Sequence, residues 1–416
     1  MSAPRRSQLP PKLGPFVVGA KIGGGGMAAV YLGRRDIGDV PGQNLVALKV
    51  IKDNLAGNRE YEVMFDDEAR ILSRLDHPNI IRHVAYGRED EFGYIAMELV
   101  LGRSLMDAWE ACSQAGRHMP IDLGAHVGLC VAEALHYAHE LKDESGKRLD
   151  VVHRDVNPTN IFLTYDGQVK LIDFGLAKAK GRAYKSAEGI VKGKVPYLAP
   201  EQITEEQIDH RADIYALGAT LWEMTTGRRL FKRETDGETI RAIKAHDIPD
   251  PRSIVEGWYP ESMWNIVERA LAKDRAQRQQ TAGELASDLR GMLAKYGRKA
   301  PMQEALAAFL EELFPGENTR QAAWLIEATE KAIPAMTMAP PAPIAQIPDM
   351  TSKMERAPSA TPSPAETSPA RREAEPEPIA RAEPRAAPVT RSLVRPVLAG
   401  AILAVMLIAA YAVLRS

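Results

Sequence analysis

Residues 152–162 read VHRDVNPTNIF, and residues 170–176 read KLIDFGL. Each stretch joins a short apolar run, typical of a buried strand, to polar residues typical of a loop. The two loops bring Asp155, Asn160 and Asp173 close together in the chain. A carboxylate can orient a hydroxyl nucleophile, while an amide and a second carboxylate supply the oxygen ligands that Mg2+ prefers. This combination predicts phosphoryl transfer from a nucleotide whose phosphates are bound to magnesium.

Four further motifs accompany these two stretches. Residues 22–30 form the glycine-rich run IGGGGMAAV, Lys49 lies in VALKV, Glu68 falls on the next predicted helix, and residues 199–201 read APE. With these motifs in this order, the chain resembles the protein kinase family, and most closely the bacterial Hanks-type serine/threonine kinases, over residues 16–293. The resemblance implies an α+β fold with two lobes. A small antiparallel β lobe would carry one helix, a large lobe would be mostly helical, and a nucleotide would lie in the cleft between them.

The bulk composition limits the classes of function. The 416 residues carry a formal net charge of −2, so no basic excess indicates a nucleic-acid partner. The two cysteines, Cys112 and Cys130, are widely separated and lack CxxC spacing. A disulfide framework and a zinc site are therefore not expected, and a reducing compartment fits better.

The ends of the kinase-like segment differ from it in composition. Residues 1–15 contain basic residues but no apolar run, which predicts a disordered lead-in rather than a secretory signal.

Residues 298–333 contain two short amphipathic helix patterns split by Pro315 and Gly316. The sequence leaves open whether this helical extension packs on the large lobe or forms a docking element. Residues 334–392 contain thirteen prolines and no glycine, which predicts a disordered, semi-stiff spacer. A ligand for a proline-recognising partner is the alternative.

An uncharged apolar segment follows this linker. Residues 397–414 read VLAGAILAVMLIAAYAVL. At about 1.5 Å per residue a helix of this length spans roughly 27 Å, close to the hydrocarbon core of a bilayer. Arg381, Arg385, Arg391 and Arg395 precede it and favour a cytoplasmic N-terminal side. We expect a single-pass C-terminal anchor with the kinase domain in the cytoplasm; a buried core helix or a partner-binding tail is the alternative.

The resemblance also implies a nucleotide site and its ligands. Lys49 would hold the α- and β-phosphates of ATP, and Glu68 would position Lys49. Met97 would lie at the back of the adenine pocket, and the backbones of Glu98 and Val100 would bond adenine. The residues expected to contact the nucleotide are Ile22, Gly23, Gly24, Gly25, Gly26, Val30, Ala47, Lys49, Met97, Glu98 and Val100. The third glycine of the family pattern is replaced by Ala28.

The catalytic loop is assigned in the same way. Asp155 would be the catalytic base, and Asn160 and Asp173 would hold Mg2+, with Mn2+ as a substitute. Three neighbouring positions are expected to be structural. His153 would be a packed core histidine, Asp213 would cap the backbone of the catalytic loop, and Glu201 would pair with Arg278.

Two positions depart from the family's serine/threonine branch. Asn157 stands where a lysine usually contacts the γ-phosphate, and Lys194 stands where a threonine usually faces the base. Our hypothesis is a swap, in which Lys194 supplies the cation and Asn157 a neutral hydrogen bond. In the same loop, Ser186 is favoured over Tyr184 as a regulatory phosphosite, and a loop that is never phosphorylated is an equal alternative.

We therefore expect a membrane-anchored protein kinase with a signalling role. It would transfer the γ-phosphate of ATP to serine or threonine hydroxyls of proteins, itself included, and dimerisation is compatible with this role. The main alternative is a pseudokinase or scaffold that binds nucleotide without efficient transfer. A kinase of small molecules is disfavoured by the APE motif and the full set of large-lobe helices, and tyrosine specificity by the composition of the catalytic loop.

Overall fold

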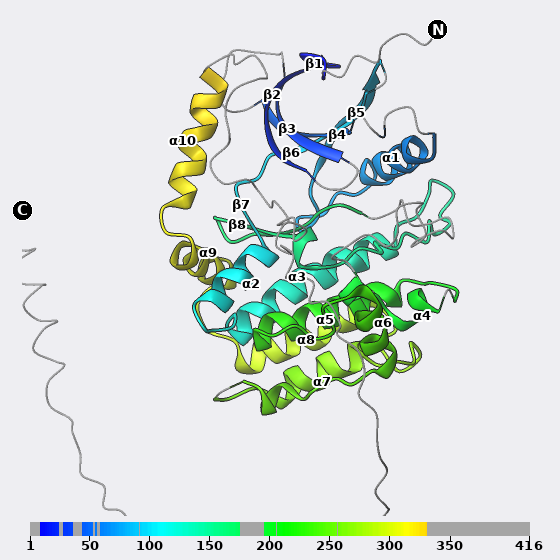
Figure 1. The fold of residues 1–416 in the computed structure, drawn as a ribbon, viewed down its shortest axis with the longest axis vertical. Helices are drawn as coiled ribbons and strands as arrows, with labels where there is room; N and C mark the ends of the chain where they lie inside the picture. The colour runs from blue at the N-terminus through cyan, green and yellow to red at the C-terminus, as the bar shows by residue number, and fades with distance from the viewer. Residues whose placement is uncertain are drawn as a thin grey trace, which may run out of the picture. The chain divides into compact units, whose positions relative to one another are not determined.

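The computed structural model describes residues 9–24, 28–35, 44–52, 55, 59–90, 92–174, 195–204, 206–255 and 257–330. Figure 1 shows a small lobe built around a sheet and a large lobe built mainly of helices. This is the predicted two-lobed architecture.

The small lobe is an antiparallel sheet with one helix. Its strand order is β1-β2-β3-β4-β6-β5. The elements are β1 (Lys12–Leu13), β2 (Phe16–Gly24), β3 (Ala28–Arg35), β4 (Leu45–Ile51), helix α1 (Arg59–Leu72), β5 (His83–Glu89) and β6 (Phe92–Glu98). Side chains alternate across the sheet, so Val46, Leu48 and Val50 pack into one core while Lys49 points to the opposite face.

The first strand begins inside the segment expected as a disordered lead-in. Lys12–Leu13 pairs with β2, and the Leu13 and Phe16 side chains are fully buried in the small-lobe core. Gly14 has φ +54°, and a Cβ there would lie 2.1 Å from the Tyr94 hydroxyl. The expected lead-in was therefore too long, because the apolar Leu13 finds a place in the core.

Two helices of the large lobe, α3 (Ile121–His139) and α5 (Arg211–Thr226), are largely buried among the others. The helices of this lobe are α2 (Leu105–Gln114), α3 (Ile121–His139), α4 (Pro200–Ile203), α5 (Arg211–Thr226), α6 (Asp236–Ala245), α7 (Glu261–Ala270) and α8 (Ala282–Tyr296). Helix α5 buries nearly every side chain, as expected of a helix enclosed by others. A second antiparallel sheet has the order β7-β8-β9, and its strands are β7 (Gly102–Ser104), β8 (Ile161–Thr164) and β9 (Val169–Leu171). Figure 1 shows β7 and β8 on the side of the large lobe that faces the small lobe.

The C-terminal extension forms two helices, α9 (Met302–Leu313) and α10 (Glu317–Glu330). Leu306, Phe309 and Leu310 of α9 are buried in the core of the large lobe. Of the two arrangements that the sequence left open, packing on the large lobe therefore holds for α9.

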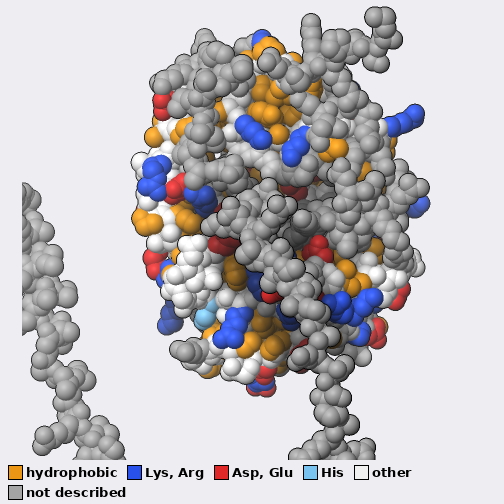
Figure 2. Space-filling model, in the orientation of Figure 1, with side chains coloured by type: hydrophobic (Ala, Val, Ile, Leu, Met, Phe, Trp, Pro, Cys, Tyr) orange, Lys and Arg blue, Asp and Glu red, His pale blue; other side chains and the backbone are white. Residues whose placement is uncertain are grey.

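The described surface is mixed in charge. Figure 2 shows acidic and basic side chains interspersed over the visible described atoms, with hydrophobic patches between them. Within the described ranges, no helix is long and apolar enough to cross a membrane. The linker at 334–392 and the apolar segment at 397–414 both lie outside those ranges.

Candidate active site

Lys49 is held between two carboxylates in the cleft. Its Nζ lies 2.7 Å from Glu68 Oε1 on α1 and 2.8 Å from Asp173 Oδ1. The predicted pairing of Lys49 with Glu68 is thus present, and Asp173 joins it. Burial alone would lower the pKa of Lys49, but Asp173 and Glu68 outweigh burial and raise it above its usual value. Lys49 is therefore a permanent cation over the whole working range of pH.

Strand pairing fixes the surroundings of Lys49. Val30 and Ile95 lie opposite Lys49 on β3 and β6, and Ala47 lies opposite Met97. Met97 is buried, as expected of a residue at the back of a pocket. These residues line one face of the sheet.

The glycine-rich turn connects β2 and β3. Gly23 and Gly24 end β2, with Gly23 opposite Val30, and Ile22 is buried beside them. Predicted contacts Gly25 and Gly26 lie outside the described residues. Ala28 begins β3 and is also buried, so its methyl group packs against the lobe.

The hinge, the segment of residues 98–101 that joins the two lobes between β6 and β7, is fixed by an ion pair that the sequence did not predict. Lys170 Nζ on β9 lies 2.9 Å from Glu98 Oε1, and both side chains are largely buried. The Glu98 amide donates to the carbonyl of Arg82, which fixes the backbone at the end of β6. The sequence did contain a signal for this pair: Lys170 lies in an apolar strand just before Asp173, and a buried cation needs an anionic partner.

Asp155 and Asn160 are joined directly. Asn160 Nδ2 donates to the carboxylate of Asp155 and to its carbonyl oxygen, each at 2.8 Å. The Ile172 amide donates to the carbonyl of Asn160, which links this loop to Asp173. Because Nδ2 makes both bonds to Asp155, Oδ1 is the atom of Asn160 suited to a hard cation.

The donor set fits magnesium held jointly with phosphates. In the described part of the chain, no group of three or more His, Cys, Asp or Glu side chains could hold a metal ion alone. One amide oxygen and one carboxylate, Asn160 and Asp173, match the usual manner of Mg2+ binding, in which substrate phosphates complete the shell.

Asp213 holds the catalytic loop through hydrogen bonds to its backbone. Its carboxylate accepts from the amides of His153 (2.8 Å) and Arg154 (2.7 Å) and from His139 Nε2 (2.8 Å). Arg154 has φ +63°, a left-handed conformation that these bonds stabilise. Burial favours a higher pKa for Asp213, but the bonds from His139 and the Arg154 amide and the nearby rings of His139 and His153 together outweigh it and lower the pKa. The predicted capping role of Asp213 is confirmed.

His153 is a fully buried core histidine, as expected. Its Nδ1 accepts from the Asp155 amide at 3.3 Å, and Nε2 donates to the carbonyl of Ile172 at 3.2 Å. Its ring lies 4.5 Å from that of Phe174. Burial lowers the pKa of His153, so the neutral ring links the catalytic loop to the segment that carries Asp173.

Asn157 makes neutral hydrogen bonds within its own loop. Its Oδ1 accepts from the Thr159 amide at 2.9 Å, and its Nδ2 donates to the carbonyl of Asp155 at 2.8 Å. The side chain is buried and caps the short 3-10 helix Pro158–Asn160. It holds the loop rather than facing a phosphate. Lys194, Tyr184 and Ser186 lie outside the described residues, so the swap and the phosphosite remain hypotheses.

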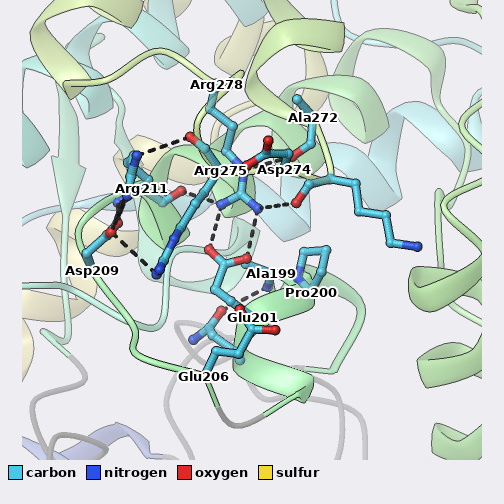
Figure 3. Close-up of polar contacts among 12 residues, drawn as sticks. Ala199, Pro200, Glu201, Glu206, Asp209, Arg211, Ala272, Asp274, Arg275 and Arg278 are labelled. Carbon is cyan, nitrogen blue, oxygen red and sulfur yellow. Dashed lines mark hydrogen bonds and ion pairs between the residues drawn. The ribbon is translucent and has the colours of Figure 1, made fainter.

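Glu201 and Arg278 form the predicted bridge, shown in Figure 3. Arg278 Nη1 and Nη2 donate to the two carboxylate oxygens of Glu201 at 2.6 and 2.8 Å, and both residues are buried. Arg278 also donates to the carbonyls of Arg211, Ala272 and Lys273. This bidentate pair ties α4 to the segment that precedes α8.

Comparisons with known proteins agree with this geometry. A family model described as the protein kinase domain matches residues 16–288. Tyrosine-protein kinase MasK of Myxococcus xanthus is 37% identical over 283 residues, 68% of this chain and 44% of MasK. Serine/threonine-protein kinase PrkC of Bacillus subtilis is 34% identical over 272 residues, 65% of this chain and 39% of PrkC. PknL of Mycobacterium tuberculosis, a serine/threonine-protein kinase, is 32% identical over 66% of this chain and 64% of PknL.

A solved structure shares the fold. The kinase domain of Mycobacterium tuberculosis PknI aligns with a TM-score of 0.51 and 26% identity, over 67% of this chain and 97% of that domain. The chain spans less than half the length of MasK and PrkC. The family match covers well over half of the chain and includes Lys49, Glu68, Asp155, Asn160 and Asp173. The chain belongs to the protein kinase family, and its relatives are bacterial kinases of the predicted Hanks type.

Proposed function

We propose that the protein transfers the γ-phosphate of ATP to serine or threonine hydroxyls of protein substrates. The observation that carries this proposal is the convergence of Lys49, Glu68 and Asp173 at one side of the cleft, beside the bonded pair Asp155 and Asn160. A site built only for nucleotide binding would not need Asp155.

Each side chain has a task that its contacts allow. Lys49, kept cationic by its two carboxylates, binds the phosphates. Asp155, held by Asn160 and by the capped loop, orients the acceptor hydroxyl and takes its proton. Bound Mg2+ would neutralise charge on the phosphates, held by Asn160 Oδ1 and Asp173. Mn2+ would fit the same oxygen ligands.

The choice between hydroxyl types rests on the relatives. PrkC and PknL are named serine/threonine kinases, whereas MasK is named a tyrosine kinase. We favour serine and threonine, because PrkC and PknL both carry that name and the catalytic loop lacks the tyrosine-kinase arrangement. Phosphoamino-acid analysis of the labelled product decides between the two classes.

The test of the activity uses the full chain with labelled ATP, Mg2+ and a general protein substrate. We expect labelled substrate and self-phosphorylation from the wild type, and loss of both from Asp155→Asn. This substitution removes the carboxylate but keeps the shape of the side chain. Nucleotide binding without any transfer by the wild type would instead establish a pseudokinase.

We further propose that residues 397–414 anchor the protein in a membrane, with the kinase domain in the cytoplasm and residues 334–392 as a spacer. The support is the uncharged apolar run and the arginines before it. Fractionation of cells that express the full chain, or a chain ending at residue 392, tests this. The full chain should sediment with membranes and the shortened chain should not; equal distribution would contradict the anchor.

A further inference from the structure

Helices α9 and α10 lie beyond the part of the chain that matches the kinase family, which ends at residue 288. Figure 1 shows α10 extending from α9 on the side of the molecule that carries β7 and β8. The bend between them, at Phe314 and Gly316, lies next to the strand that follows the hinge. This position suggests a connection to nucleotide binding.

The end of the hinge is tightly fixed to β8. Strand β7 begins at Gly102, directly after the hinge, and pairs with β8. A Cβ on Gly102 would lie 2.1 Å from the carbonyl oxygen of Leu163, so the two backbones are in close contact. The Tyr165 amide also donates to the carbonyl of Leu101. A shift of β7 or Tyr165 would therefore move the hinge backbone.

Arg103 connects this strand to α10. Its Nη2 lies 2.8 Å from Glu317 Oε1 in the first turn of α10, and only about a tenth of either side chain is exposed. The guanidinium also lies 5.3 Å from the centre of the Phe314 ring. Arg103 on β7 thus contacts both Phe314, at the bend between α9 and α10, and Glu317, at the start of α10.

A second buried contact joins the same elements. Gln321 Nε2 donates to the Tyr165 hydroxyl at 3.1 Å, and Gln321 is itself buried. Next to it, Gln303 Nε2 on α9 donates to the carbonyl of Asp166. A Cβ on Gly167 would lie 1.9 Å from the carbonyl oxygen of Gln303, so the β8–β9 turn touches α9 directly. The extension therefore contacts both β7, which follows the hinge, and the β8–β9 turn next to it.

We propose that α9 and α10 form a clamp on the outer side of the hinge, and that Arg103 is the positioning residue through which the clamp sets nucleotide affinity. The inference rests on the proposed function, because the hinge backbone must hold adenine. Adenine recognition by backbone groups is directional, so a small displacement of β7 weakens binding without touching the groups that carry out transfer.

The chain provides a matched control for Arg103. Arg117 lies 5.7 Å from the ring centre of Phe309 and pairs with Glu312 at 2.6 Å. It thus makes the same two kinds of contact with α9, but it follows α2 and lies away from the hinge strand. Arg117→Gln removes the same kinds of contact with the extension, although at a more exposed place (39% and 61% exposed side chains), and it leaves the contacts of β7 in place.

The experiment measures the Kd of a non-hydrolysable ATP analogue, the KM for ATP, kcat and the thermal unfolding midpoint on the full chain. Coupling between two sites typically changes affinity by about 5- to 150-fold, and for Arg103→Gln and Glu317→Gln we expect about fivefold weaker nucleotide binding with kcat changed less than about twofold. Arg117→Gln should leave nucleotide affinity unchanged. The double variant Arg103→Glu with Glu317→Arg, which restores the ion pair with its charges exchanged, should bind nucleotide more tightly than either single variant.

The outcomes separate this inference from the proposed function. If the wild type binds nucleotide and the Arg103 and Glu317 variants bind it equally well, with only a lower unfolding midpoint, the clamp is merely structural and the inference is overturned. The proposed function is then unaffected. If the wild type binds no nucleotide, the proposed function fails, and the inference fails with it.

Discussion

Lys49 lies where the two lobes and the nucleotide phosphates would meet, and its substitution tests the site at the scale of one residue. Lys49→Met would leave Glu68 and Asp173 facing the phosphates without a cation. We expect transfer to fall by at least about 100-fold, because loss of one preorganised charged group in a dry site costs that much. Lys52→Met, a change of a lysine just beyond the same strand, serves as the control in the same assay and should keep activity.

Lys194 is the residue whose role the structure leaves as a hypothesis. Asn157 is occupied with the backbone of its own loop, so a cation for the γ-phosphate must come from another residue. Lys194→Ala should lower kcat by about 100-fold if it supplies that charge. Adding Asn157→Lys to this variant should recover part of the loss. Steady-state kinetics of both variants decide, and an unchanged kcat for Lys194→Ala would refute the swap.

His153 makes stability depend on pH. Its folded form is neutral with a lowered pKa, whereas in the unfolded chain it takes up a proton below its ordinary pKa of 6.5. The unfolded state then binds more protons, so the free energy of unfolding is highest above that pH and falls as pH drops below it. Urea unfolding at pH 7.5 and 5.5 measures this difference.

The variant His153→Asn should reduce the pH dependence without abolishing it. Burial also lowers the pKa values of His77, His126 and His246, and these act in the same direction. An equal slope for the variant and the wild type would show that His153 is not a source of the dependence.

At the scale of elements, the extension helix α9 behaves as part of the large lobe. Leu310 is fully buried, whereas Ile326 on α10 is 61% exposed. Leu310→Ala should lower the free energy of unfolding by about 2–5 kcal/mol through lost burial and the cavity left behind. Ile326→Ala should change it by no more than about 0.5 kcal/mol. Denaturant unfolding of the full chain compares them, and equal small effects would show that α9 does not stabilise the lobe.

The sequence predicted elements well where local pattern and motif agreed. The small antiparallel lobe that the family pattern implied is the observed sheet, and Glu68 lies on a helix as predicted, namely α1 (Arg59–Leu72). Strand β1 was missed because two residues carry no periodicity, and only the tertiary place of Leu13 reveals it. The docking of α9 could not be predicted either, since an amphipathic pattern shows that a face is buried but not against what.

At the scale of the whole molecule, the sequence predicted the parts of the candidate site that lie in motifs but not the contacts that depend on tertiary structure. Motifs separated along the chain predicted that Lys49 pairs with Glu68, and it does, whereas the second contact of Lys49, with Asp173, was not predicted. The Glu98–Lys170 pair and the Arg103–Glu317 pair were not predicted, because they join residues far apart in sequence whose types fit many partners. Asn157 was expected to supply a neutral hydrogen bond, but the sequence did not identify its partners, which are backbone groups of the loop next to it.

The proposed function requires one site that would bind nucleotide phosphates through Lys49 and magnesium through Asn160 and Asp173. Calorimetric titration of the full chain with ATP, with and without Mg2+, tests it most directly. We predict that Mg2+ strengthens ATP binding by at least about tenfold, or 1.4 kcal/mol, in the wild type. Asp173→Asn should lose that gain. ATP affinity that is the same with and without Mg2+, or that Asp173→Asn leaves fully magnesium-dependent, would contradict the account.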